Sequence, residues 1–476
     1  MKTSRRTFLK QTALAAGAVT LSPRSWAQVA GANDDIRFGV VGFHSRGKDH
    51  IKEIGELKGA RVTALCDVDS NVLDEGVANL KAKGQTVEAY RDIRKLLESK
   101  NVDAISIATP NHWHALAAIW GIEAGKDVYV EKPVSHTVWE GSRIVAAARR
   151  NNKIVQTGTQ SRSSSGLREA VEWVHAGNIG KILVSRGLCY KPRGSIGRTT
   201  APLPIPSNID YDLWSGPAPL VPPHRAHLHY DWHWFWLYGD GDIGNRGIHE
   251  MDVARWFLDE PALSPSILSI GGRLGYIDDA ETPNTLIAFH DYPKAPLIME
   301  VRGLPTKAHA KEMDAYKGAS IGVVVECEGG YVVVSDYQSA KAFDKEGKEL
   351  AHFKGASSHF ENFAAAVRSR KESDLNAPIQ GGHISSALCH TANISYRVGA
   401  RQAPDAIREQ IKGSAAASAA FDRMAEHLAA NKVNLESTEL TLGQHLQMDP
   451  TTETFPDQPA ANALLTREYR APFVVT

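Results

Sequence analysis

The chain has 476 residues, with 42% hydrophobic and 23% charged side chains, which is ordinary for a soluble globular protein large enough for two domains. Lys and Arg balance Asp and Glu at 54 each, so the formal net charge is zero. This balance excludes a general electrostatic attraction to nucleic acid or to an anionic membrane, and we expect specific pockets to carry recognition. The 4 cysteines are scattered without CxxC or zinc-like spacing, which excludes a disulfide scaffold.

The first 27 residues are predicted to be an export signal. Residues 4–10, SRRTFLK, match a twin-arginine motif, an apolar run follows at 13–21, and Ser25-Trp26-Ala27 is a small-x-small cleavage site. The apolar run is too short to anchor the chain in a membrane. The twin-arginine route carries proteins already folded, often with cofactor bound. We therefore expect a periplasmic or exported protein with a linker at 28–35, the alternative being an accidental basic start.

From residue 36 to residue 158, short apolar strands alternate with helical stretches. This alternation is typical of βαβ units around a parallel sheet, and it predicts a first domain over 36–158. The expected strands are 36–42, 61–66, 87–90, 104–108, 128–130 and 154–157, and the clearest helices are 48–57 and 115–124.

The pattern changes after residue 158. A longer strand at 182–190 and a Gly/Pro-rich loop precede closely spaced strands with short turns, which predict an open, largely antiparallel sheet. The predicted fold class is therefore α/β, with a parallel-sheet domain, an α/β domain over 159–400 and a C-terminal extension over 401–476. The later strands are expected at 266–271, 285–290, 297–301, 322–328 and 331–335, with helices at 358–369 and 383–398.

The loop GFHSRG at 42–47 lies between a strand and a helix, as a dinucleotide fingerprint requires. His44 stands where GxGxxG has its second glycine, so its side chain either crowds a pyrophosphate or swings aside and donates to it. Asp67 ends the second strand, where a carboxylate accepts from ribose hydroxyls and repels a 2′-phosphate. The alternatives are a structural turn and a capping aspartate. The sequence predicts a Rossmann domain that binds NAD rather than NADP, with contacts from Gly42, His44, Ser45, Arg46, Gly47 and Asp67.

Two further motifs carry candidate catalytic groups. Lys132, in YVEKP at the end of a parallel strand, is placed where it can share a hydroxyl proton, and partial desolvation would lower its pKa. A solvated strand-end lysine is the alternative. Asn245 and His249 are four residues apart in GNRGIHEMD and share one face if this segment is helical. A lone histidine in such a segment is more often structural.

Together these motifs resemble the glucose–fructose oxidoreductase / inositol dehydrogenase / MocA family over residues 36–398. The resemblance implies a Rossmann domain followed by an open-sheet α/β domain, assembled as a homo-oligomer. It also implies catalytic roles for Lys132 and His249. Many relatives have an aspartate where this chain has Asn245, and an amide cannot accept a proton, so the base is Lys132 or His249. The implied cofactor contacts are Thr109, Pro110, Asn111, His114 and Glu131.

Histidines and aromatic residues alternate over residues 224–238. Flat rings beside polar groups suit a sugar, while metal binding and plain packing are the alternatives. We predict no metal site, because alternation sends neighbouring side chains to opposite sides of an extended chain. The candidate substrate contacts are His233, Trp234, Gln160 and Arg162.

These observations predict hydride transfer at a sugar or polyol carbon, with Lys132 taking the hydroxyl proton, helped by His249. Free NAD is scarce outside the cytoplasm, so an exported enzyme must regenerate a retained cofactor. It does so either by reducing a second substrate or by transiently oxidising one sugar, as an NAD-dependent glycosidase or lyase would. A non-catalytic NAD- or ligand-binding protein is the third hypothesis. The expected partner is a small sugar, with no nucleic acid and no membrane beyond export.

Overall fold

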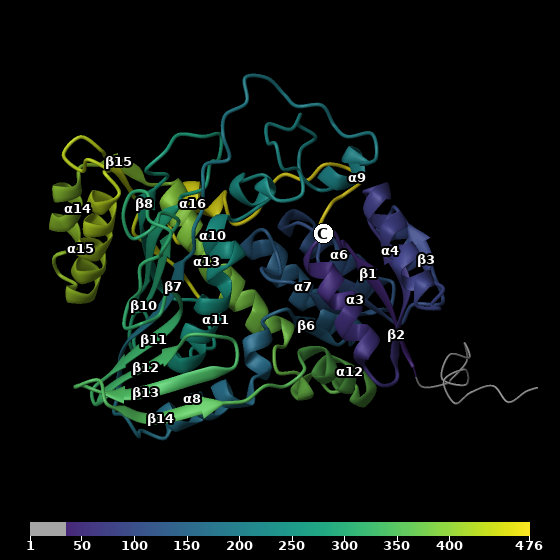
Figure 1. The fold of residues 1–476 in the computed structure, drawn as a ribbon, viewed down its shortest axis with the longest axis horizontal. Coiled ribbons are helices and arrows are strands. Elements are labelled where there is room, and N and C mark those ends of the chain that lie inside the picture. The colour runs from purple at the N-terminus through teal and green to yellow at the C-terminus, as the bar shows by residue number, and fades with distance from the viewer. Residues whose placement is uncertain (1–34) are drawn as a thin grey trace, which may run out of the picture.

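The computed structural model describes residues 35–476 (Figure 1). The predicted export signal at 1–27 lies outside these residues. Within residues 35–476, no helix combines the length and the apolar character needed to cross a membrane.

The first domain is a parallel six-stranded sheet in the order β3-β2-β1-β4-β5-β6. Its inner strands are apolar and buried on both faces, as helices on both sides of a parallel sheet require. The predicted Rossmann-type sheet is confirmed. Its strands are β1 (Ile36–Val41), β2 (Ala60–Cys66), β3 (Glu88–Tyr90), β4 (Ala104–Ile107), β5 (Asp127–Val130) and β6 (Val155–Thr157), and its helices are α3 (Arg46–Glu56), α4 (Ser70–Ala82), α5 (Ile93–Leu97), α6 (Asn111–Glu123) and α7 (Val138–Asn151).

The second domain is built on an eleven-stranded open sheet in the order β14-β13-β12-β11-β7-β10-β9-β8-β16-β15, with β17 paired to β8. Only β7 and β10 pair in parallel, so the predicted open, largely antiparallel sheet is confirmed. The strands are β7 (Ile182–Tyr190), β8 (Ser266–Gly272), β9 (Thr285–His290), β10 (Leu297–Arg302), β11 (Ile321–Cys327), β12 (Gly330–Val334), β13 (Ser339–Asp344), β14 (Glu349–Lys354), β15 (Ala400–Gln402), β16 (Leu440–Leu442) and β17 (Leu446–Gln447).

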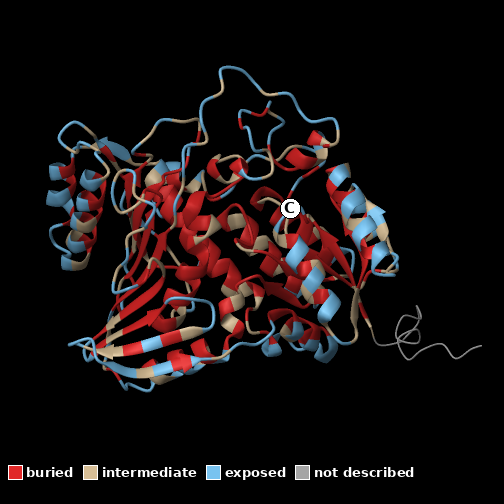
Figure 2. Cartoon of the chain, viewed as in Figure 1, coloured by how far each residue is buried: buried red, intermediate tan, exposed pale blue. Residues whose placement is uncertain are grey.

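Helices cover both faces of this sheet. The face towards the first domain packs on α8, α11 and α13 in one core, and the other face packs on α14 and α15 (Figure 1). Figure 2 shows α13 buried along most of its length, whereas α14 and α15 expose their outer sides. The helices are α8 (Ser165–His175), α9 (Tyr211–Ser215), α10 (Gly241–Asn245), α11 (Gly247–Leu258), α12 (His359–Ser369), α13 (Ile379–Arg397), α14 (Pro404–Ile411), α15 (Ala415–Ala430) and α16 (Pro459–Asn462).

The residues after 400 are integrated into both domains. β15, β16 and β17 extend the second sheet, and the last residues return to the first domain. There Phe473 packs edge-on against Trp113, with ring centroids 5.5 Å apart, and Arg467 bonds the buried carboxylate of Glu140 at 2.8 Å. This part of the chain therefore fastens the two domains together.

Candidate active site

A cleft of about 680 Å³ lies where the first and second domains meet. One wall is formed by the carboxyl ends of β1, β2, β4 and β5, at the point where the strand order reverses on either side of β1 and β4. Such a switch point is where open α/β sheets bind their ligands. The other wall comes from the second domain, through residues 229–233, the start of α11 and the turn after β12.

The phosphate loop after β1 requires glycine at both ends. Gly42 has φ +75°, and a Cβ there would lie 2.9 Å from the backbone of Thr109. A Cβ on Gly47 would lie 2.2 Å from the carbonyl oxygen of Gly42, so Gly47 closes the turn without itself lining the cleft. No side chain caps the start of α3, which leaves its first N–H groups available to an anion. His44 and Ser45 line the cleft, and the His44 ring stacks on His229.

Asp67 lies at the end of β2, beside the phosphate loop, and is 8% exposed. Its Oδ2 accepts from the backbone N–H of Phe43 and its Oδ1 from that of Asp69, both at 3.0 Å. Burial raises the pKa of Asp67, and these two N–H donors oppose that effect. Asp67 therefore joins β2 to the phosphate loop at the position predicted for a ribose contact.

Several buried polar atoms along the cleft have no hydrogen-bond partner among residues 35–476. They are Thr109 Oγ1, Asn111 Oδ1, Arg246 Nε and His249 Nδ1. Buried polar atoms are nearly always paired, so these atoms fit a polar ligand in the cleft. Together with the glycine loop and the uncapped α3, they fit a dinucleotide.

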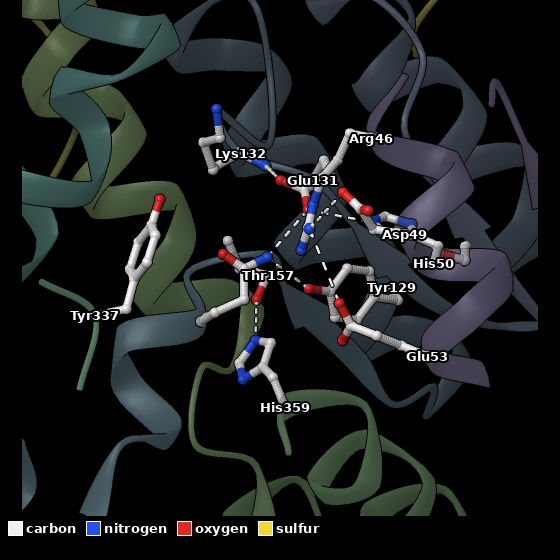
Figure 3. Close-up of polar contacts among 12 residues, drawn as sticks. Arg46, Asp49, His50, Glu53, Tyr129, Glu131, Lys132, Thr157, Tyr337 and His359 are labelled. Atoms are coloured by element: carbon white, nitrogen blue, oxygen red, sulfur yellow. Dashed lines mark hydrogen bonds and ion pairs between the residues drawn. The ribbon is translucent and has the colours of Figure 1, made fainter. Parts of the chain in front are cut away.

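Glu131 is the centre of a buried polar network at the end of β5 (Figure 3). Its Oε1 accepts from Arg46 Nε at 3.0 Å, His50 Nε2 at 3.1 Å and Gln160 Nε2 at 3.0 Å. Burial alone would raise the pKa of Glu131, but the His50 bond and the Arg46 charge hold it well below its ordinary value. Glu131 and Arg46, both predicted as cofactor contacts, thus bind each other, and Gln160, predicted as a substrate contact, binds Glu131.

Lys132 follows Glu131 and points away from that network (Figure 3). Its Nζ donates to the main-chain carbonyl of Asn245 at 2.5 Å, so residue 245 orients the lysine through its backbone. Burial lowers the pKa of Lys132, the Glu131 charge opposes this, and the Arg246 charge adds to it. A larger fraction of Lys132 than of a surface lysine is therefore in the neutral amine form, which can accept a proton.

His249 lies in the first turn of α11, and a short break at Arg246 separates it from Asn245 at the end of α10. Both residues line the cleft, although they lie on two short helices and not on the single helix that the four-residue spacing requires. Burial, followed by the Lys132 charge, lowers the pKa of His249 well below its ordinary value. His249 is therefore neutral at neutral pH, with its Nδ1 free of protein partners among the described residues.

His114 joins two of the predicted motifs. Its ring nitrogens lie 2.8 Å from the carbonyl of Thr109 and 2.6 Å from that of Pro133. Burial lowers the pKa of His114, and the hydrogen bonds to these two carbonyls oppose that effect. Pro110 precedes α6 and Asn111 is its first residue, and all of these predicted residues line the cleft.

The predicted substrate contacts divide into two groups. His233 lines the cleft and donates from Nδ1 to the carbonyl of Tyr230 at 2.5 Å, which leaves Nε2 as an acceptor, and burial lowers its pKa to about 3. Arg162 and Trp234 do not line the cleft. Arg162 forms a forked pair with Asp252 at 2.8 and 2.9 Å, and Trp234 packs under Arg193.

The sequence did not predict three residues of the site as acid–base or substrate-side groups. They are Glu250, Arg246 and Tyr337. Glu250 is buried beside His249, pairs with Arg246 at 2.9 Å, and borders a small cavity shared with Tyr337. Burial raises its pKa to about 7, against the opposing charge of Arg246. Tyr337, from the turn after β12, bonds Arg246 and packs edge-on against His249. Their pairing depends on β11 and β12 packing on α11, which local spacing does not reveal.

Comparison with known proteins places this fold and site in a family. The family model described as "Oxidoreductase family, NAD-binding Rossmann fold" matches residues 36–159. A second model, described as "Oxidoreductase family, C-terminal alpha/beta domain", matches residues 173–293. The chain belongs to the Gfo/Idh/MocA family. Its first domain is thus an NAD-binding Rossmann domain, and the predicted resemblance is confirmed.

Individual Gfo/Idh/MocA relatives match parts of the chain. A "Glycosyl hydrolase family 109 protein" of Shewanella pealeana is 35% identical over 178 residues, which are 32% of this chain and 38% of that protein. An inositol 2-dehydrogenase/D-chiro-inositol 3-dehydrogenase of Shouchella clausii is 39% identical over 142 residues, which are 29% of this chain and 40% of that protein. The chain thus matches about two fifths of the length of these relatives.

Solved Gfo/Idh/MocA structures share the fold over a longer span. The WlbA dehydrogenase of Bordetella pertussis, in complex with NADH and UDP-GlcNAcA, has a TM-score of 0.55 at 20% identity, covering 75% of this chain and 97% of its own. An oxidoreductase of Agrobacterium radiobacter, in complex with NAD+, L-tartaric acid and magnesium, has a TM-score of 0.55 at 13% identity, covering 75% and 95%. These likenesses show the fold alone.

The raised pKa of Glu250 predicts a pH-dependent effect of replacing it. Between its ordinary pKa of 4.5 and about 7, the folded protein retains a proton that the unfolded chain releases, so Glu250 makes wild-type stability fall as pH rises. The amide introduced by Glu250→Gln does not titrate. Relative to wild type, the free energy of unfolding of Glu250→Gln should therefore increase by about 3 kcal/mol as pH rises through this window. Its Tm should rise relative to that of wild type in the same direction.

Calorimetry on both proteins at several pH values measures this difference. Glu172→Gln, at an exposed position of α8, is the control and should follow wild type. A Tm difference between Glu250→Gln and wild type that stays constant with pH would contradict the raised pKa.

Proposed function

We propose that the protein is an NAD-dependent oxidoreductase that acts on the hydroxyl or ketone of a sugar or polyol, with a tightly held cofactor. The observation that carries this proposal is the position of Lys132, a lysine of lowered pKa held in the cleft beside the neutral His249. When bound, the dinucleotide supplies reversible two-electron redox chemistry at its nicotinamide ring. The phosphate loop, Asp67, Thr109 and Asn111 would hold it.

The proton chemistry of the proposal belongs to Lys132 and His249. The carbonyl of Asn245 accepts one N–H of Lys132 Nζ and so fixes the amine, while the neutral amine takes the proton of a substrate hydroxyl. In the reverse direction the ammonium form returns that proton to a ketone oxygen. His249, which is neutral and lines the cleft beside Lys132, is proposed to assist at the same hydroxyl.

A sugar or polyol suits the substrate end of the cleft. His233 Nε2 offers an acceptor to a hydroxyl, and the half of the cleft next to it is bordered by Trp232, whose ring stacks on His233 with centroids 3.6 Å apart. A flat aromatic wall next to hydrogen-bonding groups suits a ring with apolar C–H faces and polar hydroxyls. The inositol dehydrogenase relative is named for a polyol of this class.

A second candidate function is glycoside cleavage through transient oxidation of the sugar, with no net redox change. It is favoured by the similarity to the glycosyl hydrolase family 109 protein of Shewanella pealeana. Both candidates use the same lysine and the same cofactor. Export by the twin-arginine route with the cofactor already bound is part of the proposal, and it is supported by the motif at residues 4–10.

The test uses mature protein released from the periplasm and purified without added cofactor. After denaturation, released nucleotide is identified by mass, and intact protein is assayed on sugars, polyols and aryl glycosides. We expect bound NAD and turnover without net NADH, and free sugar released from glycosides would select the second candidate. An empty protein that makes stoichiometric NADH from added NAD+ would contradict the retained cofactor.

Replacing Lys132 separates catalysis from cofactor binding. Lys132→Met should lower turnover by about 10²–10⁴-fold, the usual contribution of a positioned acid–base group, while its NAD content stays that of wild type. Lys126→Met is the matched control, because Lys126 is a partly buried lysine outside the cleft that bonds the carbonyls of Ser99 and Val102. Turnover of Lys132→Met equal to that of Lys126→Met would contradict the assigned role.

Asp67 is proposed to favour NAD over NADP. Its carboxylate adjoins the predicted ribose position, where a negative charge repels a 2′-phosphate. Asp67→Asn removes the charge with little change of shape, although its amide NH2 cannot accept one of the two backbone N–H bonds. The loss of that bond affects both nucleotides, so the ratio of the NADP+ and NAD+ dissociation constants should fall by about tenfold, equivalent to one modest charge–charge interaction. Calorimetric titration of both nucleotides measures the ratio. An unchanged ratio would show that the selectivity lies elsewhere.

A further inference from the structure

Residues 206–238 cross from the second domain to the first and form one wall of the cleft. We call this segment the strap. Figure 1 shows α9, within the strap, beside the end of the first domain that carries α4. Two backbone bonds fasten it there, from Ser70 N–H to the Asn208 carbonyl at 2.9 Å and from Asp210 N–H to the Val68 carbonyl at 3.1 Å. The strap therefore lies over the carboxyl end of β2, where Asp67 stands.

Asp69 is the main side-chain anchor of the strap. It caps α4 through the backbone N–H of Asn71, and it also accepts from Asn208 Nδ2 at 2.7 Å and from His229 Nε2 at 2.9 Å. Although burial raises it, the pKa of Asp69 lies below its ordinary value because Asn208 and His229 donate to the carboxylate. The His229 bond is thus a bond to a charged group, which is stronger than one between neutral groups.

His229 also contacts the phosphate loop. Its ring stacks on that of His44, with centroids 4.0 Å apart and planes 5° from parallel. Both rings line the cleft. One continuous series of contacts therefore runs from the phosphate loop through His44 and His229 to Asp69. It joins the two domains at the end of the cleft that holds the glycine turn.

This arrangement explains why the phosphate loop tolerates a histidine where the fingerprint has glycine. The stack takes the His44 side chain to the strap, while the uncapped N–H groups at the start of α3 still face an anion. A glycine at position 44 would leave His229 without its stacking partner on the phosphate loop.

We propose that His229 is a cofactor-binding residue supplied by the second domain, and that the His44–His229 stack closes the cleft over the bound pyrophosphate and slows release of the dinucleotide. The inference rests on the retained cofactor of the proposed function and gives it a structural cause. A dinucleotide on the phosphate loop lies between the Rossmann sheet and the strap, and it leaves when the contacts of His229 open.

The test measures cofactor release directly and needs no sugar substrate. Wild type and His229→Ala are loaded with isotopically labelled NAD+, chased with unlabelled NAD+, and the label retained on the protein is followed by mass over time. Loss of a bond to a charged group together with the stack should accelerate release by about tenfold or more.

His227→Ala is the matched control. His227 lies two residues earlier on the strap, pairs with Asp231 at 3.1 Å, and has a side chain that is 77% exposed and outside the cleft. It should release NAD+ at the wild-type rate. A release rate of His229→Ala equal to that of His227→Ala would overturn the proposal, even if the Tm of His229→Ala were lower, because a purely structural strap would change stability alone.

A second variant keeps the test decisive if His229→Ala does not fold. His229→Gln retains a donor for Asp69 but loses the flat ring that stacks on His44, so it should also release NAD+ faster than wild type. An unchanged rate in this variant would overturn the role of the stack. Absence of sugar turnover in every protein would count against the proposed function and would leave the comparison of release rates intact.

Discussion

The carboxylate of Glu131 is buried at the bottom of the first domain's wall of the cleft, where the two domains meet. Taking a charge out of water is costly unless partners replace the lost hydration. Here Arg46 comes from the phosphate loop, His50 from the same helix α3, and Gln160 from the turn that leads into the second domain. Gly158 leaves the space for the carboxylate, since a Cβ there would lie 2.7 Å from it. The phosphate loop, the end of β5 and the domain junction thus share one buried anion.

The position of Lys132 follows from this network. Glu131 fixes the end of β5, so the next residue emerges into the cleft, where the carbonyl of Asn245 meets its amine. The second domain completes the arrangement by placing α10 and α11 against the first domain, and α12 packs on the Rossmann sheet through Phe360, whose ring stacks on Tyr129. The acid–base groups of the site therefore come from both domains, and their mutual position depends on the interface between them.

Much of the first domain and the location of the site follow from local sequence signals. Buried parallel strands such as β4 are continuous apolar runs, and the glycine turn, Asp67 and Lys132 are tied to strand ends by short-range geometry. Strands β13 and β14 were not predicted, because each is partly exposed and lacks a continuous apolar run. The sequence likewise selected Asn245 for its place on the face of His249, whereas the contact with Lys132 is made by the main-chain carbonyl of Asn245, which no residue type selects.

The remaining site features depend on contacts between distant segments. His229 reaches Asp69 across 160 positions of the chain, and Glu250 becomes buried through the packing of α11 on the second sheet. Arg162 and Trp234 have residue types that suit a sugar, yet Asp252 and Arg193 engage them outside the cleft. Residue type and spacing select candidates of this kind, and only the tertiary partner decides which of them face the ligand.

The central claim is that burial lowers the pKa of Lys132 while the Glu131 carboxylate limits that fall. Competitive acetylation of the folded protein over a range of pH, read residue by residue by mass spectrometry, measures this pKa without any substrate, and surface lysines in the same digest serve as the reference. We expect Lys132 to titrate below the surface lysines in wild type, and lower still in Glu131→Gln, because the opposing negative charge is gone. A Lys132 that titrates with the surface lysines, or that does not respond to Glu131→Gln, would contradict the account.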